Sequence, residues 1–184
     1  KSCVSYCILS YLLGIGDRHM ENIMIKTTGE IFHIDFGFIL GYDPKLLKPE
    51  IRITNEMVDA MGGKNSKYYN LFRDLCTKSI ICLRKHINMF KLLLGELENT
   101  YIDKNTKLTR DYIEKFIDDK FLIGENFDEV KLYLINKIDN RSKIYSDTLI
   151  DFCHNSWTKE STSTLSNQAY NYSNSIFNYF YGDN

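Results

Sequence analysis

The most regular feature of the sequence is a set of stretches in which apolar residues recur every three or four positions. This spacing gathers apolar side chains on one face of a helix. It predicts helices over residues 1–13, 56–61, 67–94, 110–117 and 127–157, with a break near 140–142. The chain is therefore expected to be mainly helical.

Residues that favour helix ends support these boundaries. A glycine stops a helix readily, and a side-chain oxygen on Ser, Thr or Asn accepts from the first free backbone N–H groups. The predicted end residue is Gly14 for the first helix, and the predicted starts are Thr54, Ser66, Thr109 and Asn126 for the later ones.

A β-hairpin follows the first helix. Two short apolar runs, 23–25 and 31–34, are joined by a turn at 27–29 that contains glycine. A hairpin brings its ends together, so Asn22 and Asp35 should meet at its open end. An amide oxygen and a carboxylate suit a hard cation such as Mg²⁺, which completes its shell with water and phosphate oxygens.

The stretch 35–53 has no sustained period and holds both prolines of the chain. Such a segment is typical of a surface loop that carries function. Its cations are Lys45, Lys48 and Arg52. The remaining long segment, 161–184, is rich in Ser, Asn and Tyr, and we expect it to be disordered. The alternative is that its aromatic residues insert at a bilayer surface.

Composition narrows the possible classes. The 23 basic and 24 acidic residues nearly cancel, so nothing favours nucleic acid as a partner of the whole chain. No apolar run approaches the ~20 residues of a membrane span, and no signal peptide is expected. The 5 cysteines lack zinc-ligand spacing, which favours buried thiols in a reducing compartment.

Two polar motifs border the hairpin, Asp-Arg-His with an Asn three residues later and Asp-Phe-Gly. Protein kinases use a base, an Asn and an Asp-Phe-Gly for phosphoryl transfer. The reversed order Asp-Arg-His resembles the phosphatidylinositol 3-/4-kinase superfamily. The stretches HIDFGFILGYDPKLLKP and MVDAMGG are most similar to class III phosphatidylinositol 3-kinases.

The resemblance implies a fold class, α+β and mostly α. Residues 1–159 would form the carboxy-terminal lobe of a protein-kinase-like fold, with a small β-hairpin at the active site. The amino-terminal lobe is expected to be absent from this stretch and supplied in cis or in trans. Residues 160–184 would be the disordered tail, and the chain alone is expected to be inactive.

The resemblance assigns catalytic roles to the first motif. His19 would be the general base, because a neutral imidazole can accept a proton from a hydroxyl near pH 7. Asp17 would orient His19, or be the base itself. Arg18 would contact phosphate or pair with a carboxylate inside the protein, and we favour the second. Asn22 and Asp35 would hold Mg²⁺ or Mn²⁺.

The resemblance also implies a nucleotide site on the hairpin. Met24 and Ile34 would lie under the adenine ring of ATP, with Asp35 beside the phosphates. Ordinary strand packing of both residues is the alternative, and the two are compatible. His33 is expected to be structural.

Phe36 and Gly37 would open the activation loop, which selects the lipid headgroup in this superfamily. Sparse cations at Lys45, Lys48 and Arg52 suit an inositol that carries only its linking phosphate. The alternative is that they are solvated surface charges.

Two features differ from or extend the class III pattern. Tyr42 stands where the family has Arg, and residues 47–50 replace a proline run.

Trp157 with Lys159 is similar to the aromatic and basic cluster with which the family touches membranes, since Trp favours the boundary between apolar and aqueous surroundings.

The function implied is ATP-dependent phosphoryl transfer to the 3-hydroxyl of phosphatidylinositol. The expected location is cytoplasmic, peripheral at endosomal or other intracellular membranes, in membrane trafficking and autophagy. A regulatory kinase-like or scaffold subunit is an expected partner. The alternatives are a non-catalytic module that binds lipid or a partner, a phosphatidylinositol 4-kinase, and a related Ser/Thr protein kinase.

Overall fold

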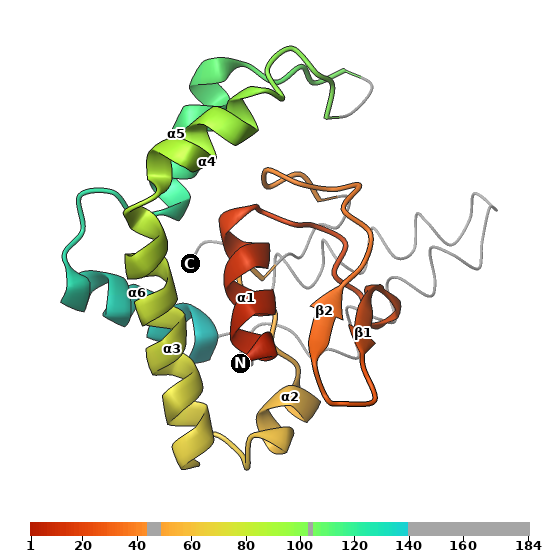
Figure 1. Cartoon of the computed structure of the whole chain (residues 1–184), viewed down its shortest axis with the longest axis vertical. Helices are drawn as coiled ribbons and strands as arrows, with labels where there is room; N and C mark the ends of the chain where they lie inside the picture. Colours follow the sequence, from red (N-terminus) through yellow and green to blue (C-terminus); the bar gives the residue numbers. More distant parts are fainter. Residues whose placement is uncertain (44–48, 103–104, 140–184) are drawn as a thin grey trace, which may run out of the picture. The chain divides into compact units, whose positions relative to one another are not determined.

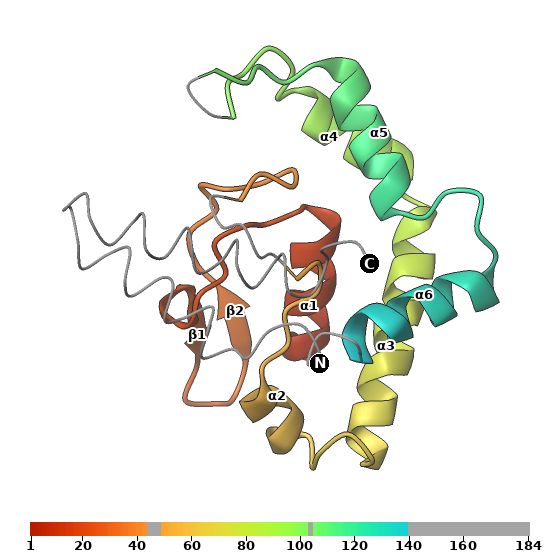
Figure 2. The same ribbon diagram turned by 180° about the vertical axis from the view of Figure 1, so that it is seen from behind.

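The computed structural model describes residues 1–43, 49–102 and 105–139. These ranges are mostly helical, with a small antiparallel sheet of two strands (Figures 1 and 2). The elements are α1 Ser2–Leu12, a 3₁₀ turn at Met20–Asn22, β1 Ile23–Ile25, β2 Ile31–His33, α2 Asn55–Ala60, α3 Lys67–Arg84, α4 Ile87–Gly95, α5 Arg110–Lys120 and α6 Phe127–Asp139.

Helix α1 is the most deeply buried element, as its apolar composition predicted. It contacts β2 on one side and α3 on the other, and it lies between them in Figure 1. The backbone leaves the helix at Gly14, which has a φ of +56°. Its buried apolar side chains are Val4, Tyr6, Cys7, Ile8, Tyr11 and Leu12.

The predicted hairpin is confirmed. Its strands pair in the register Ile23 with His33, Met24 with Phe32, and Ile25 with Ile31. The turn closes with a bond from the Lys26 N–H to the Glu30 carbonyl at 2.9 Å. The Ile31 N–H donates to Ser2 Oγ at 3.1 Å, which fastens the hairpin to the start of α1.

All four predicted helix starts are confirmed by their capping bonds. The side-chain oxygen of Thr54 accepts from the Met57 N–H at 3.3 Å at the start of α2. Ser66 and Thr109 make the equivalent bonds, at 3.0 and 3.2 Å, for α3 and α5. At the start of α6, Asn126 Oδ1 accepts from the Asp128 and Glu129 N–H groups at 2.9 and 3.0 Å. Each bond satisfies an N–H that has no partner within its helix.

The prediction of one helix over residues 67–94 is wrong. The chain forms α3 and α4, and between them His86 leaves helical geometry with a φ of −113° and a ψ of +17°. Helix α3 packs against α1 and α6, whereas α4 packs against α5. The chain must change direction to reach these different partners, although its apolar spacing continues. The predicted helix 110–117 extends to Lys120.

A strap from Ile51 to Thr54 crosses the core after the loop. Ile51 and Ile53 are fully buried, and the Cys7 thiol of α1 donates to the Arg52 carbonyl at 3.5 Å. The strap therefore joins α1 to α2 through both apolar contact and a backbone acceptor.

Several predictions fall outside the described residues. These concern the helix beyond residue 139, the tail 160–184, and the residues Lys45, Lys48, Trp157 and Lys159. Among the helices that the structure describes, none combines the length and apolar character needed to cross a membrane.

Candidate active site

The open end of the hairpin brings the two predicted metal ligands onto neighbouring backbone. The Ile34 N–H donates to the Asn22 carbonyl at 2.9 Å, so the segments meet there, and Asp35 is the next residue. Asp35 Oδ1 accepts from the Gly37 N–H at 2.9 Å. A Cβ at position 37 would lie 3.2 Å from that oxygen, which favours glycine there. Asp35 Oδ2 takes no part in this bond.

Asn22 also holds the loop of residues 14–19, which we call the catalytic loop after its predicted role. Its Nδ2 donates to the Asp17 carbonyl at 3.0 Å, which leaves Oδ1 as the atom of the amide that can bind a cation. Asp17 and Asp35 both have left-handed backbone, with φ of +46° and +69°. Non-glycine residues adopt this conformation rarely, and Asp is among those that tolerate it best.

His19 lies between two carboxylates. Its Nε2 is 3.7 Å from Asp17 Oδ2, and its Nδ1 is 3.9 Å from Glu21 Oε2. The imidazole is 9% exposed, whereas the Glu21 side chain is 77% exposed. The geometry therefore brings His19 and Asp17 together, as the motif predicted, and leaves Glu21 at the surface.

Arg18 points the other way, into the protein. Its Nη1 donates to the Glu50 carbonyl at 3.1 Å, and its Nη2 donates to the Pro49 carbonyl. Burial lowers the pKa of the guanidinium from its usual value. These contacts favour a structural role for Arg18 over contact with phosphate. Its acceptors are backbone carbonyls, whereas we expected a carboxylate.

One face of the hairpin carries exposed apolar side chains. Met24 and Phe32 are directly paired, so they share a face, and Ile34 is two residues beyond Phe32 on the same face. They are 44%, 40% and 39% exposed. Phe32 was not predicted as a site residue, although its alternation with Ile34 could have indicated it.

His33 lies on the opposite face, against α1. Its ring stacks on Tyr6 with centroids 6.4 Å apart and meets Phe36 edge-on at 5.6 Å. Burial, followed by the charge of Arg18, lowers the pKa of His33 and favours the neutral ring. These contacts are those of a structural histidine, which positions the ring of Phe36, the residue that follows Asp35.

Backbone bonds tie the two halves of the site together. The Leu40 N–H donates to the Leu13 carbonyl at 2.8 Å, Gly41 to Gly14 at 3.0 Å, and Gly16 to the Phe38 carbonyl at 2.9 Å. A Cβ at Gly14 would lie 2.3 Å from the Gly41 nitrogen, so only glycine permits this approach. The glycines around Ile15 therefore serve close backbone packing.

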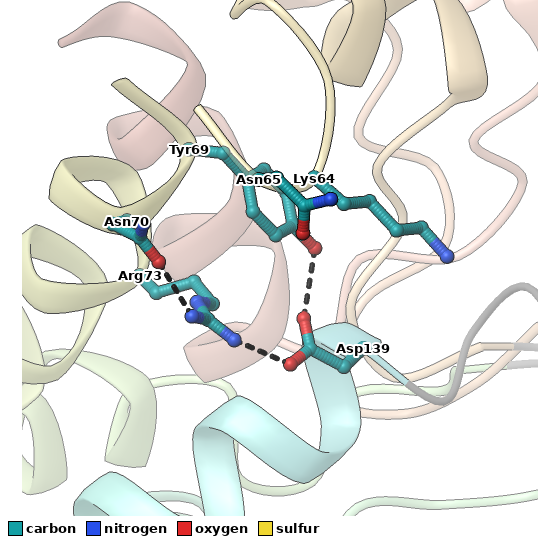
Figure 3. Close-up of a pocket in the computed structure, with 6 residues that line it drawn as sticks. All are labelled: Lys64, Asn65, Tyr69, Asn70, Arg73 and Asp139. Atoms are coloured by element: carbon teal, nitrogen blue, oxygen red, sulfur yellow. Dashed lines mark hydrogen bonds and ion pairs between the residues drawn. The ribbon is translucent and has the colours of Figure 1, made fainter. Parts of the chain in front are cut away.

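A pocket elsewhere contains none of these residues. Figure 3 shows it between the start of α3 and the end of α6, where Arg73 and Tyr69 reach toward Asp139. Arg73 Nη1 is 2.5 Å from Asp139 Oδ2, and the Tyr69 hydroxyl donates to Oδ1 at 2.9 Å. We call these three residues the α3–α6 clamp, because their contacts join the two helices.

The sequence matches the family described as phosphatidylinositol 3- and 4-kinase over residues 1–121. The chain belongs to this family. The matched range contains the hairpin, both polar motifs and the strap. Helix α6, which follows Phe121, lies beyond the match.

Named kinases are also similar, two of the three below over a longer range than the family match. The chain is 34% identical to phosphatidylinositol 3-kinase pik3 of Schizosaccharomyces pombe over 155 residues, or 84% of this chain. It is 46% identical over 99 residues (52% of this chain) to phosphatidylinositol 3-kinase VPS34 of Arabidopsis thaliana, and 31% over 160 residues (84%) to that of Saccharomyces cerevisiae. The chain spans 19%, 12% and 18% of these relatives' lengths.

Arg52, at the end of the predicted activation loop, does not lie at the surface as the prediction required. Arg52 is only 4% exposed and lies between two buried isoleucines, so its guanidinium is not at the surface where a headgroup would approach. The alternation of apolar residues at 51 and 53 could have indicated a buried strap. Glu50, which was not predicted, accepts bonds from three side chains.

Among the described residues, no group of three or more His, Cys, Asp or Glu could hold a metal ion. The Asn22 and Asp35 pair is a smaller donor set. It consists of hard oxygen atoms only, and it fits a cation that takes most of its ligands from water and phosphate.

Proposed function

We propose that the chain is part of the catalytic core of a phosphatidylinositol 3-kinase. This enzyme would transfer the γ-phosphoryl group of ATP to the 3-hydroxyl of phosphatidylinositol. The observation that carries the proposal is the bond that places Asn22 beside Ile34, the residue before Asp35, at the open end of the hairpin. In the adjoining loop, His19 Nε2 lies 3.7 Å from Asp17 Oδ2.

The donor set supports a magnesium or manganese site. Asn22 Oδ1 and Asp35 Oδ2 are the atoms that would hold the ion. When bound, such an ion neutralises the charge of the phosphate oxygens. The protein contributes the spacing of the two ligands, because both are fixed by backbone bonds.

His19 would act on the lipid hydroxyl. As the hydroxyl oxygen bonds to the γ-phosphorus, the bond to the leaving ADP oxygen breaks and the hydroxyl proton passes to an imidazole nitrogen of His19. Asp17 would stabilise the imidazolium that forms. A base of this kind typically contributes about 10²–10⁴ in rate.

The exposed apolar face supports nucleotide binding. Met24, Phe32 and Ile34 offer a flat apolar surface next to Asp35, and a purine ring would cover them. Burying such side chains is favourable at roughly 25 cal/mol per Å². ATP placed on this surface would direct its phosphates toward the metal ligands.

The remaining parts of the proposal follow from the family. The chain would form the carboxy-terminal lobe of a kinase fold, with the amino-terminal lobe in cis or in trans. It would act on lipid at intracellular membranes, with a regulatory subunit as partner. Lys45, Lys48, Trp157 and Lys159 would contact headgroup or membrane.

The family includes 3-kinases and 4-kinases, so the position of phosphorylation needs a direct test. The named relatives are 3-kinases, which supports the 3-hydroxyl.

The test uses the protein that carries this chain, purified at full length. Vesicles of phosphatidylinositol are incubated with labelled ATP and Mg²⁺, and the products are separated by headgroup. Phosphatidylinositol 3-phosphate is expected, with loss of product on chelation. The 4-phosphate would refute the position, labelling of Ser/Thr peptides alone would favour a protein kinase, and no turnover would favour a binding module.

A further inference from the structure

Glu50 connects the loop to two helices through its side chain. Lys120 of α5 donates to Oε2 at 3.1 Å, and the Tyr133 hydroxyl of α6 donates to the same oxygen at 3.2 Å. Lys137 of α6 donates to Oε1. The carboxylate is 32% exposed. Three donor side chains thus hold the chain at position 50.

Glu50 and Lys137 remain charged at neutral pH. Burial acts to raise the pKa of Glu50, but the hydrogen bonds and charges of Lys137 and Lys120 outweigh it and hold the pKa below its usual value. For Lys137, burial acts to lower the pKa, and the bond to Glu50 outweighs it and raises the value. Lys120 also lies 4.6 Å above the ring of Tyr11 in α1.

The backbone of the same residue holds the catalytic loop. The Glu50 carbonyl accepts from Arg18 Nη1 at 3.1 Å, and the Pro49 carbonyl accepts from Nη2. Arg18 stands between Asp17 and His19 and is buried. A shift of residue 50 would therefore move the two carbonyls that hold Arg18, and Arg18 is the neighbour of His19, the proposed base.

We infer that Glu50 is a positioning residue for phosphoryl transfer. Its carboxylate, held by Lys120 and Lys137, fixes the carbonyls that bind Arg18, and through Arg18 it fixes His19 and Asp17. This inference rests on the proposed function. It also assigns α5 and α6 a role in the reaction, although neither contributes a residue to the site.

The α3–α6 clamp provides a matched control. Asp139, the last residue of α6, accepts from a cation and a tyrosine hydroxyl as Glu50 does (Figure 3). Its side chain is 36% exposed, close to the 32% of Glu50. It joins α6 to α3, because its partners Arg73 and Tyr69 both belong to α3 rather than to the catalytic loop. Removing its charge should loosen α6 without moving Arg18.

The experiment compares Glu50→Gln with Asp139→Asn in the full-length protein. Both variants should lower the melting temperature by similar amounts. Only Glu50→Gln should lower kcat, by about tenfold, with the KM for ATP within twofold of wild type, because a small displacement of a base slows chemistry more than binding. An unchanged kcat in Glu50→Gln, or an equal loss in Asp139→Asn, would overturn the inference.

The partners of Glu50 give a second measurement. Lys120→Met with Lys137→Met should lower kcat to the level of Glu50→Gln, and adding Glu50→Gln should lower it no further, because the three groups act as a unit. Additive losses would contradict a shared role.

Hydrogen exchange separates this inference from the proposed function. Backbone amides of residues 16–20 should exchange several-fold faster in Glu50→Gln than in wild type or Asp139→Asn. This readout does not depend on kinase activity. Lack of turnover in the wild type would refute the proposed function, whereas unchanged exchange in Glu50→Gln would refute the positioning role.

Discussion

Helix α1 and the hairpin are both rich in apolar residues, but the protein uses them differently. The side chains of Tyr6, Ile8 and Leu12 are buried in the core, whereas Met24 and Phe32 remain exposed beside the proposed metal ligands. Burial of apolar surface is the main favourable term in folding, so apolar residues left in water at a polar site indicate a ligand surface. Hydrophobicity alone does not separate the two roles.

The backbones differ in the same way. Helix α1 is regular, while the segments at the hairpin's open end contain left-handed Asp17 and Asp35. Such conformations cost about 1–2 kcal/mol each and collect at functional sites. Stability is therefore concentrated in one region and chemistry in the other, and each can be altered separately.

The largest expected effect is on chemistry alone. In the full-length protein, Asp35→Asn should lower kcat about 10²–10⁴-fold or more, because it removes a negative metal ligand. Asn tolerates left-handed backbone and retains an acceptor for Gly37, so the melting temperature should stay within about 2 °C. Lipid phosphorylation and thermal melting measure the two effects. Asp59→Asn on α2 is the control, and a retained rate in Asp35→Asn would remove the metal assignment.

A core variant should produce the opposite result. Ile80→Ala on α3 removes a fully buried side chain and should lower the free energy of unfolding by about 2–5 kcal/mol. Leu71→Ala on the same helix, where the side chain is 51% exposed, should cost less than about 1 kcal/mol. Urea unfolding measures both. Equal losses would show that α3 is not packed as described.

A smaller effect is expected on the apolar face of the hairpin. Phe32→Ala should raise the KM for ATP about tenfold, which corresponds to about 1.4 kcal/mol of lost apolar contact, with little change in stability. Ile25→Ala, on the other face and near the turn, should leave the KM unchanged. Steady-state kinetics would reject the nucleotide surface if both variants bound ATP like the wild type.

The smallest effect concerns His33. Its pKa in the folded protein is lowered by burial and by Arg18, with His19 adding to the shift and Asp35 and Asp17 opposing it. The unfolded chain therefore binds the proton more readily, and stability falls as pH drops below about 6.5. His33→Phe keeps the ring contacts and should reduce the loss of melting temperature between pH 7.5 and 5.5. An identical pH dependence in both proteins would mean that His33 does not contribute.

The sequence was most informative where local rules act alone. The extent of α1, the hairpin and its turn, and the caps at Thr54, Ser66 and Thr109 all follow from short-range spacing and side-chain chemistry. The division of the predicted helix 67–94 does not, because no glycine or proline marks it. Its cause is the different packing partners of α3 and α4, which only the tertiary structure determines.

The candidate site shows the same limit. The approach of Asn22 to Asp35 follows from the hairpin, and the pairing of His19 with Asp17 follows from their nearness in the chain. The partners of Arg18 are 31 and 32 residues away, and those of Glu50 are 70 to 87 residues away. Contacts of this range depend on how helices pack, and the charge pattern around them gave no indication.

The three backbone bonds between residues 13–16 and 38–41 have a further consequence. They fasten the segment that bears His19, the proposed proton acceptor, to the segment that bears Asp35, the proposed cation holder, without any side chain. The distance between the two chemical groups is thus preset before a nucleotide or a lipid arrives. The entropy of aligning them is lost once, when the polypeptide folds, and not again in every catalytic cycle.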